Sequence, residues 1–181
     1  QALNALEKAI LLDPSDPDLL NAKAYTLYLA GRSGEARSIA EDALQKNPGD
    51  PAALDTLGAI LLSEGDPRQA LSYLKRAESS LPRDPEVLAH LGDAYRLLGQ
   101  DTLAQDKYQR SLSLDPSLAR AWKGYSAVLL SLGRYPEAAA AISEAYRFYP
   151  GDPDLIGWEK KADEILLEWY LKDESGKAGL S

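Results

Sequence analysis

The sequence predicts an all-α solenoid in which antiparallel helix pairs stack one after another. Prolines recur at a step of 34 residues, and one series of glycines and one of alanines keep the same step without a slip. Between these marks the apolar residues recur at i, i+3 and i+4, the spacing of one face of an α-helix. A period of 34 residues is typical of a repeated helical hairpin.

Each recurring residue has a physical role in such a hairpin. The glycines end the first helix, because glycine accepts the left-handed backbone angles of a tight turn. They are Gly31, Gly65, Gly99 and Gly133. The alanines allow the two helices to cross closely. They are Ala2, Ala36, Ala70, Ala104 and Ala138.

The prolines stop the second helix, since they remove a backbone donor and disfavour helical angles in the preceding residue. They are Pro14, Pro48, Pro82, Pro116 and Pro150. A second proline, preceded by aspartate, follows three residues after most of them. These aspartates are predicted helix N-caps, with the proline at the first helical position. They are Asp16, Asp50, Asp84 and Asp152.

The period divides the chain into one partial and four full repeats. Residues 1–16 match only the second helix of a repeat, and the full repeats cover 17–50, 51–84, 85–118 and 119–152. Residues 153–172 predict an amphipathic capping helix, and residues 173–181 predict a disordered tail. Because the array opens on half a hairpin and the chain of 181 residues lacks methionine, we expect it to be part of a larger protein.

The periodic pattern resembles the tetratricopeptide repeat over residues 1–172. The matching residues include Trp122, Leu91, Gly92, Tyr95, Gly99, Ala104, Tyr108 and Pro116. Lys23 and Ser126 depart mildly from the pattern. The resemblance implies a right-handed superhelix whose first helices line a concave groove that binds a protein or peptide. The Asp-Pro punctuation also resembles that of bacterial members of the family.

The resemblance implies which residues would contact a partner in the groove. They are Asn21, Tyr25, Tyr28, Asp55, Ala59, Leu62, His90, Asp93, Arg96, Arg120, Lys123 and Ala127. The four full repeats carry net charges of −1, −1, −2 and +1, so the groove is expected to change from acidic and aromatic to basic. This gradient either orients a partner or reflects scattered solvated charges.

Two alternatives stay open within that set. Tyr25 and Tyr28 either contact a partner or pack against an upstream helix, and His90 is either a ligand-binding residue or an ordinary, partly exposed histidine. The two-carboxylate clamp of the co-chaperones that hold heat-shock protein tails requires asparagines at repeat positions 9 and 6. No repeat has them, which disfavours that binding mode.

The composition excludes several other functions. The absence of cysteine excludes a disulfide framework, a zinc finger and a thiol nucleophile. No phosphate-binding loop, metalloprotease or hydrolase motif occurs, and no acidic residue is expected on an apolar helix face, so we predict no enzyme, no cofactor and no metal. The net charge of −8 argues against nucleic-acid binding. No apolar stretch is long enough for membrane insertion.

The sequence therefore predicts a non-catalytic scaffold that binds a partner peptide or helix in its groove. One alternative is the substrate-recruiting region of a larger enzyme such as a glycosyltransferase. Another is a homo-oligomer that associates through the open N-terminal half-repeat or the C-terminal helix. The compartment, cytoplasmic or periplasmic, stays undetermined.

Overall fold

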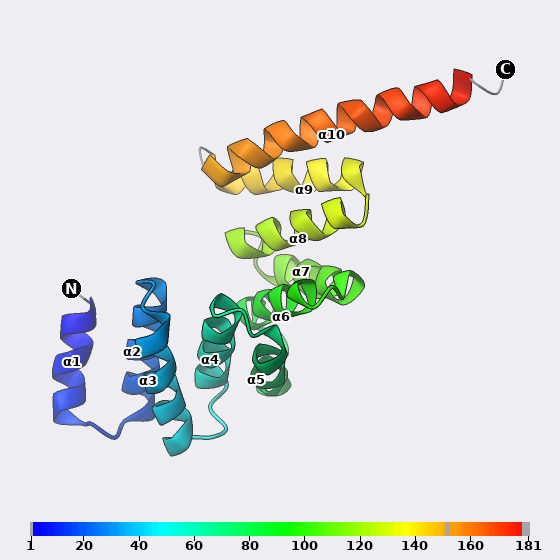
Figure 1. Cartoon of the computed structure of the whole chain (residues 1–181). Helices are drawn as coiled ribbons and strands as arrows, with labels where there is room; N and C mark the ends of the chain where they lie inside the picture. The colour runs from blue at the N-terminus through cyan, green and yellow to red at the C-terminus, as the bar shows by residue number, and fades with distance from the viewer. Residues whose placement is uncertain (1, 151–152, 179–181) are drawn as a thin grey trace.

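A computed structural model describes residues 2–150 and 153–178, which form ten α-helices and no strand. The helices are α1 (Ala2–Leu12), α2 (Pro17–Leu29), α3 (Ser33–Lys46), α4 (Pro51–Ser63), α5 (Pro67–Ser80), α6 (Pro85–Leu97), α7 (Asp101–Leu114), α8 (Ala119–Ser131), α9 (Tyr135–Phe148) and α10 (Pro153–Ala178). Figure 1 shows the pairs side by side in chain order, with the helix axes turning progressively along the stack. The predicted all-α solenoid of antiparallel helix pairs, stacked into a right-handed superhelix, is confirmed.

The turns within the pairs follow the expected chemistry. The four recurring glycines have positive φ angles between 70° and 81°, which lie in the left-handed region that glycine favours. The side chains of Asp16, Asp50 and Asp84 accept hydrogen bonds from backbone N–H groups in the first turns of α2, α4 and α6. These three N-caps are confirmed, and Asp152 lies outside the described residues.

Helix α8 follows Leu118 and has no side-chain cap, and the sequence predicts none there. One helix end differs from the sequence prediction. Helix α10 continues to Ala178, whereas the sequence predicts a disordered tail over residues 173–181. The extension follows from composition: Asp173, Glu174 and Lys177 are compatible with a helix, and the single Gly176 costs only about 1 kcal/mol. Residues 179–181 lie outside the described residues.

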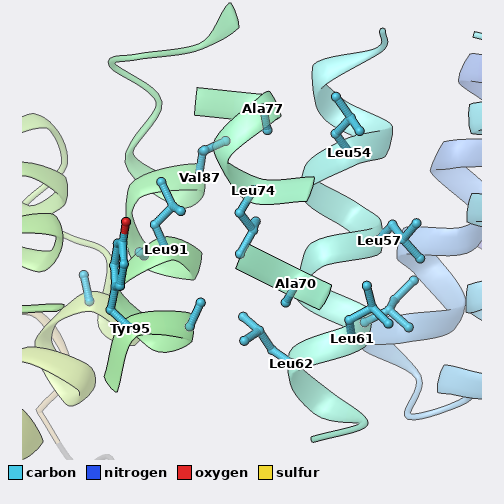
Figure 2. Close-up of a cluster of buried hydrophobic side chains, with 14 of the residues drawn as sticks. Leu54, Leu57, Leu61, Leu62, Ala70, Leu74, Ala77, Val87, Leu91 and Tyr95 are labelled. Atoms are coloured by element: carbon cyan, nitrogen blue, oxygen red, sulfur yellow. The ribbon is translucent and has the colours of Figure 1, made fainter. Parts of the chain in front are cut away.

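The core lies between neighbouring helices along the whole stack. Each first helix packs on the second helix of its pair, and α2, α4, α6 and α8 also contact one another in succession. The alanines at 36, 70, 104 and 138 are fully buried, as their spacing predicts. Figure 2 shows Leu74 of α5 between α4 and the Val87–Leu91 side of α6. The inner face of the solenoid is therefore built by the first helices of successive pairs.

A slot for the ring of Tyr108 is made by two glycines. Tyr108 projects from α7 and is fully buried between Gly92 of α6 and Gly124 of α8. A Cβ at Gly92 would lie 2.6 Å from the Tyr108 ring, and a Cβ at Gly124 would overlap the same ring. Only glycine leaves room for the ring at both places, which brings the outer helix α7 into contact with the inner face.

We predict that Gly92→Ala destabilises the fold by about 1–3 kcal/mol, because the new methyl group would overlap the fully buried ring of Tyr108 and force it to shift. The measurement is the free energy of unfolding in urea. The matched control is Gly34→Ala, since a Cβ at Gly34 meets nothing within 4 Å. The control is expected to be neutral or slightly stabilising. A Gly92→Ala variant as stable as the control would contradict the slot.

Candidate functional site

Two cavities open on the inner face. The first, of about 560 Å³, lies between α2, α4 and α6 and is lined by Asp18, Asn21, Ala22, Tyr25, Asp50, Ala52, Asp55, Thr56, Leu81, Asp84, Glu86, Val87 and His90. The second, of about 510 Å³, lies between α6, α8 and α10 and is lined by Asp93, Arg96, Ala119, Arg120, Lys123, Gly124, Ala127 and Trp158. Both volumes lie in the range of ligand sites, roughly 300–1,000 Å³.

The first cavity is acidic and partly aromatic. Its lining contains five carboxylates and no lysine or arginine. Two of these carboxylates, Asp50 and Asp84, are also helix caps. The ring of Tyr25 lies 6.3 Å from that of Tyr28, centroid to centroid, in a tilted arrangement. Burial, together with the negative charge of Glu86, raises the pKa of the Tyr25 hydroxyl. The carboxylates would repel an anionic ligand, so this cavity favours a positively charged or neutral group.

The second cavity has the opposite character. Among the described residues that line it, Arg96, Arg120 and Lys123 are basic and Asp93 is acidic. Trp158 from α10 also lines the cavity, as do the small residues Gly124 and Ala127. The charge gradient expected along the groove therefore coincides with two separate cavities.

A chain of hydrogen bonds crosses the inner face between the two cavities. Arg120 Nη2 donates to the Tyr28 hydroxyl at 2.9 Å, and Arg120 Nη1 donates to Asp93 Oδ2 at 3.1 Å. The Tyr108 hydroxyl donates to Asp93 Oδ1 at 2.6 Å. We call these four side chains the central bridge. It joins α2 to α8 through residues 92 positions apart in the sequence.

The central bridge is partly buried: the Asp93 side chain is 14% exposed and the Arg120 side chain 36%. Burial lowers the pKa of the Arg120 guanidinium, but Asp93 and Tyr28 raise it by more, so Arg120 stays charged. Burial and the Asp93 carboxylate raise the pKa of Tyr108, so its hydroxyl stays protonated and donates. The central bridge is thus an ion pair between Arg120 and Asp93, and the hydroxyls of Tyr28 and Tyr108 form hydrogen bonds to its two ends.

His90 and Asp55 form a second polar contact beneath the first cavity. His90 Nδ1 lies 2.8 Å from Asp55 Oδ1. His90 is only 3% exposed, which corrects its interpretation as a partly exposed histidine. Burial lowers the pKa of His90, and the Asp55 carboxylate raises it by more, so the net shift is upward. The imidazole therefore positions Asp55 at the cavity wall and has little surface for a ligand.

The structure brings most of the predicted site residues together. Asn21, Tyr25, Asp55 and His90 line the first cavity. The second cavity is lined by the predicted Asp93, Arg96, Arg120, Lys123 and Ala127.

Three predicted residues lie elsewhere. Tyr28 belongs to the central bridge, Ala59 is fully buried, and Leu62 is 9% exposed. Ala59 and Leu62 pack in the core because α4, in the middle of the stack, is covered by helices on nearly every side. They line neither cavity.

Sequence reasoning missed three residues that shape the site. It includes Tyr108 only among the residues that match the repeat pattern, and it does not assign Trp158 or Gly124 to the groove. The signal for Tyr108 is present, because Gly92 and Gly124 are glycines inside helices, where close packing is their usual reason. Trp158 lines the second cavity because α10 packs on α9 as a first helix would.

Two kinds of feature are absent from the part of the chain that the structure describes. No group of three or more histidine, cysteine, aspartate or glutamate side chains is arranged to hold a metal ion. In the same residues, every helix is too short or too polar to cross a membrane.

Repeated helical hairpins with an open inner face define a helical-repeat scaffold of the kind that binds other proteins. The family model of the tetratricopeptide repeat matches residues 1–51, 56–119 and 102–153, and the chain belongs to that family. A curated relative, the anaphase-promoting complex subunit CDC16 of Saccharomyces cerevisiae, is 40% identical over 57 residues. The match covers 32% of this chain and only 7% of that relative, so the chain spans a small part of its length.

Solved structures of the family share the fold. A tetratricopeptide protein of Thermus thermophilus, TTC0263, superposes with a TM-score of 0.75 at 26% identity, covering 91% of this chain and 89% of the other. MamA of Desulfovibrio magneticus RS-1 gives 0.68 at 20% identity, covering 83% and 85%. YrrB, described as having an unusual peptide-binding site, gives 0.67 at 21% identity, covering 92% and 89%.

We predict that Asp55 controls the pKa of His90. Removal of the Asp55 carboxylate should turn the upward shift of this pKa into a downward shift. The wild-type pKa of His90 is raised above its ordinary value, and Asp55→Asn brings it below that value, because burial and Arg120, which both lower it, then outweigh Asp93, which raises it. The measurement is an NMR titration, in which the single histidine of the chain gives an unambiguous signal.

The upward shift of the His90 pKa also determines how the stability of the fold depends on pH. Because the folded pKa exceeds the unfolded value, the pair's contribution is complete below about pH 6.5 and is lost as the pH rises through the folded pKa. A His90 pKa that is the same in the wild type and in Asp55→Asn would contradict the contact.

Proposed function

We propose that the chain is a non-catalytic interaction module whose inner face binds a peptide segment, extended or helical, of a partner protein. The observation that carries this proposal is the pair of open cavities, of about 560 and 510 Å³, on one continuous face. Each can accept a few side chains of a segment that runs along the face.

The polar contacts of the inner face support binding with little rearrangement. The central bridge holds Arg120, and the contact with His90 holds Asp55, so residues at the mouths of both cavities are oriented before a partner arrives. Side chains that are already ordered lose little conformational entropy on association. The membership of a scaffold family and the peptide-binding site named for YrrB agree with this function.

We predict that filling either cavity weakens peptide binding. Dodecapeptides selected from a random library on the immobilised chain should lose at least tenfold in affinity for Ala52→Trp or Ala127→Trp, because each tryptophan occupies space that the peptide needs. Ala52 lines the first cavity and Ala127 the second. The measurement is fluorescence anisotropy with labelled peptides.

The matched control is Ala140→Trp, since Ala140 is exposed on α9 and lines neither cavity. Its affinity should stay within twofold of the wild type, and circular dichroism should show equal helicity for all variants. Failure to select any peptide, or equal affinities for all three variants, would refute the proposal.

Self-association through α10 is a second candidate, favoured by the exposed apolar side chains of that helix. Leu167, Trp169, Tyr170 and Leu171 are between 43% and 61% exposed. A patch of this kind is unusual on a surface that contacts only water. If it is a contact, light scattering should show a mass that rises with concentration and falls back for Trp169→Glu. A constant monomer mass over a hundredfold concentration range would exclude this candidate.

A further inference from the structure

We propose that the first cavity binds a basic side chain, arginine or lysine, of the partner segment. This inference rests on the proposed function and adds the chemistry and the location of one bound residue. The argument depends on four residues that line the cavity from three helices, namely Tyr25 of α2, Asp55 and Thr56 of α4, and Glu86 of α6.

The lining of the first cavity carries an excess of negative charge. It contains five carboxylates, two of which also cap helices, and no lysine or arginine. Of the five, only Asp55 has an ion-pair partner among the described residues, the imidazole of His90. Arg120, whose charge reaches Tyr25, is itself paired with Asp93. Even when His90 is protonated, the lining therefore keeps a net negative charge.

Two oxygens in the wall of the cavity have unused capacity to accept hydrogen bonds. Thr56 is only 5% exposed, and its hydroxyl makes no hydrogen bond among the described residues. The Asp55 side chain is 15% exposed, and His90 contacts its Oδ1 but not its Oδ2. Neither Thr56 Oγ1 nor Asp55 Oδ2 is among the fully buried polar atoms without a partner, so solvent reaches both. Deep acceptors of this kind, one of them charged, favour a donor that brings a positive charge.

Tyr25 adds an aromatic surface to the same cavity. It lines the cavity and is exposed. Burial, Glu86 and Asp55 raise the pKa of its hydroxyl by more than Arg120 lowers it, which agrees with a negative potential around the ring. Aromatic rings attract the cations of lysine and arginine, and the long aliphatic parts of these side chains also pack on apolar surface.

The arrangement of the carboxylates favours an organic cation over a metal ion. Among the described residues, no three histidine, cysteine, aspartate or glutamate side chains are placed to hold a metal ion. The five carboxylates are instead distributed over a cavity of about 560 Å³. A guanidinium or ammonium group at the end of a flexible side chain can satisfy acceptors that are spread in this way.

The location restricts which part of the partner can lie here. The cavity lies between α2, α4 and α6, so the basic residue would be held at that end of the inner face. An aspartate or glutamate at the same place would meet like charges, which oppose binding. Attraction of basic residues and repulsion of acidic ones together select the register of the segment along the solenoid.

The test uses the complete chain and the dodecapeptides selected on it. Selected peptides should be enriched in Arg and Lys over the unselected library. Replacing the bound arginine by citrulline, or the bound lysine by acetyl-lysine, removes the charge and should weaken binding about tenfold or more. Raising the salt concentration from about 50 to about 500 mM should also reduce the affinity of the wild type for the basic peptides.

Three variants of the chain test the named residues. Asp55→Asn and Glu86→Lys should each weaken binding about tenfold or more, since they remove or reverse a charge at the cavity. Thr56→Val should cause a smaller loss of affinity without lowering the melting temperature, because the hydroxyl has no protein partner to lose.

The matched control for Glu86→Lys is Asp42→Lys, which makes the same charge change at an exposed residue of α3 that lines neither cavity. The affinity of this control should stay within twofold of the wild type, and circular dichroism should show equal helicity for both lysine variants. Peptides that bind without basic enrichment, or that bind Glu86→Lys as well as the wild type, would overturn this inference while leaving the proposed function intact. If no peptide is selected, the proposed function fails, and this inference fails with it.

Discussion

The hydrogen bond from the buried Tyr108 hydroxyl to Asp93 is the contact on which the inner face depends. It requires an outer-helix tyrosine to pass between two inner helices, and two glycines provide the space for it. With one oxygen of Asp93 occupied in this way, the other is available to Arg120. The position of Arg120, and through it that of Tyr28, follows from a residue on the other side of the repeat.

This arrangement places charged groups where burial would normally be unfavourable. A buried ion pair is costly to desolvate, and hydrogen bonds from neighbouring groups are needed to offset the cost. The two phenols supply them here, since one donates to the carboxylate and the other accepts from the guanidinium. Such a network contributes specificity more clearly than stability, because it is satisfied in only one relative placement of α2, α6, α7 and α8.

The sequence predicted the features that repeat and missed those that occur once. The helices, the caps at Asp50 and Asp84 and the left-handed glycines depend on neighbours within one period, and periodicity reports them directly. The contact between Tyr28 and Arg120 depends on the accumulated rotation of four helix pairs, which no local pattern encodes. The burial of Ala59 and Leu62 depends instead on the place of α4 in the middle of the stack, where neighbouring helices cover it on both sides.

Only the part of the candidate site that depends on repeat positions could be predicted from the sequence. Repeat positions identified which residues face inward, so both cavities contain mostly expected residues. The division into two cavities, and the contribution of Trp158 to the second, depend on how far the superhelix closes. Single glycines inside helices were the available signal for the slot, and their meaning becomes specific only when the partner ring is known.

The reach of the central bridge changes how this array should be regarded mechanically. A simple solenoid behaves as a spring, in which each unit responds only to its neighbours and strain passes along the stack in small increments. The hydrogen bond between Tyr28 and Arg120 adds a direct link between the first and fourth full repeats, which are not neighbours in the stack. A change of curvature between α2 and α8 therefore acts directly on this bond as well as on the hairpins in between.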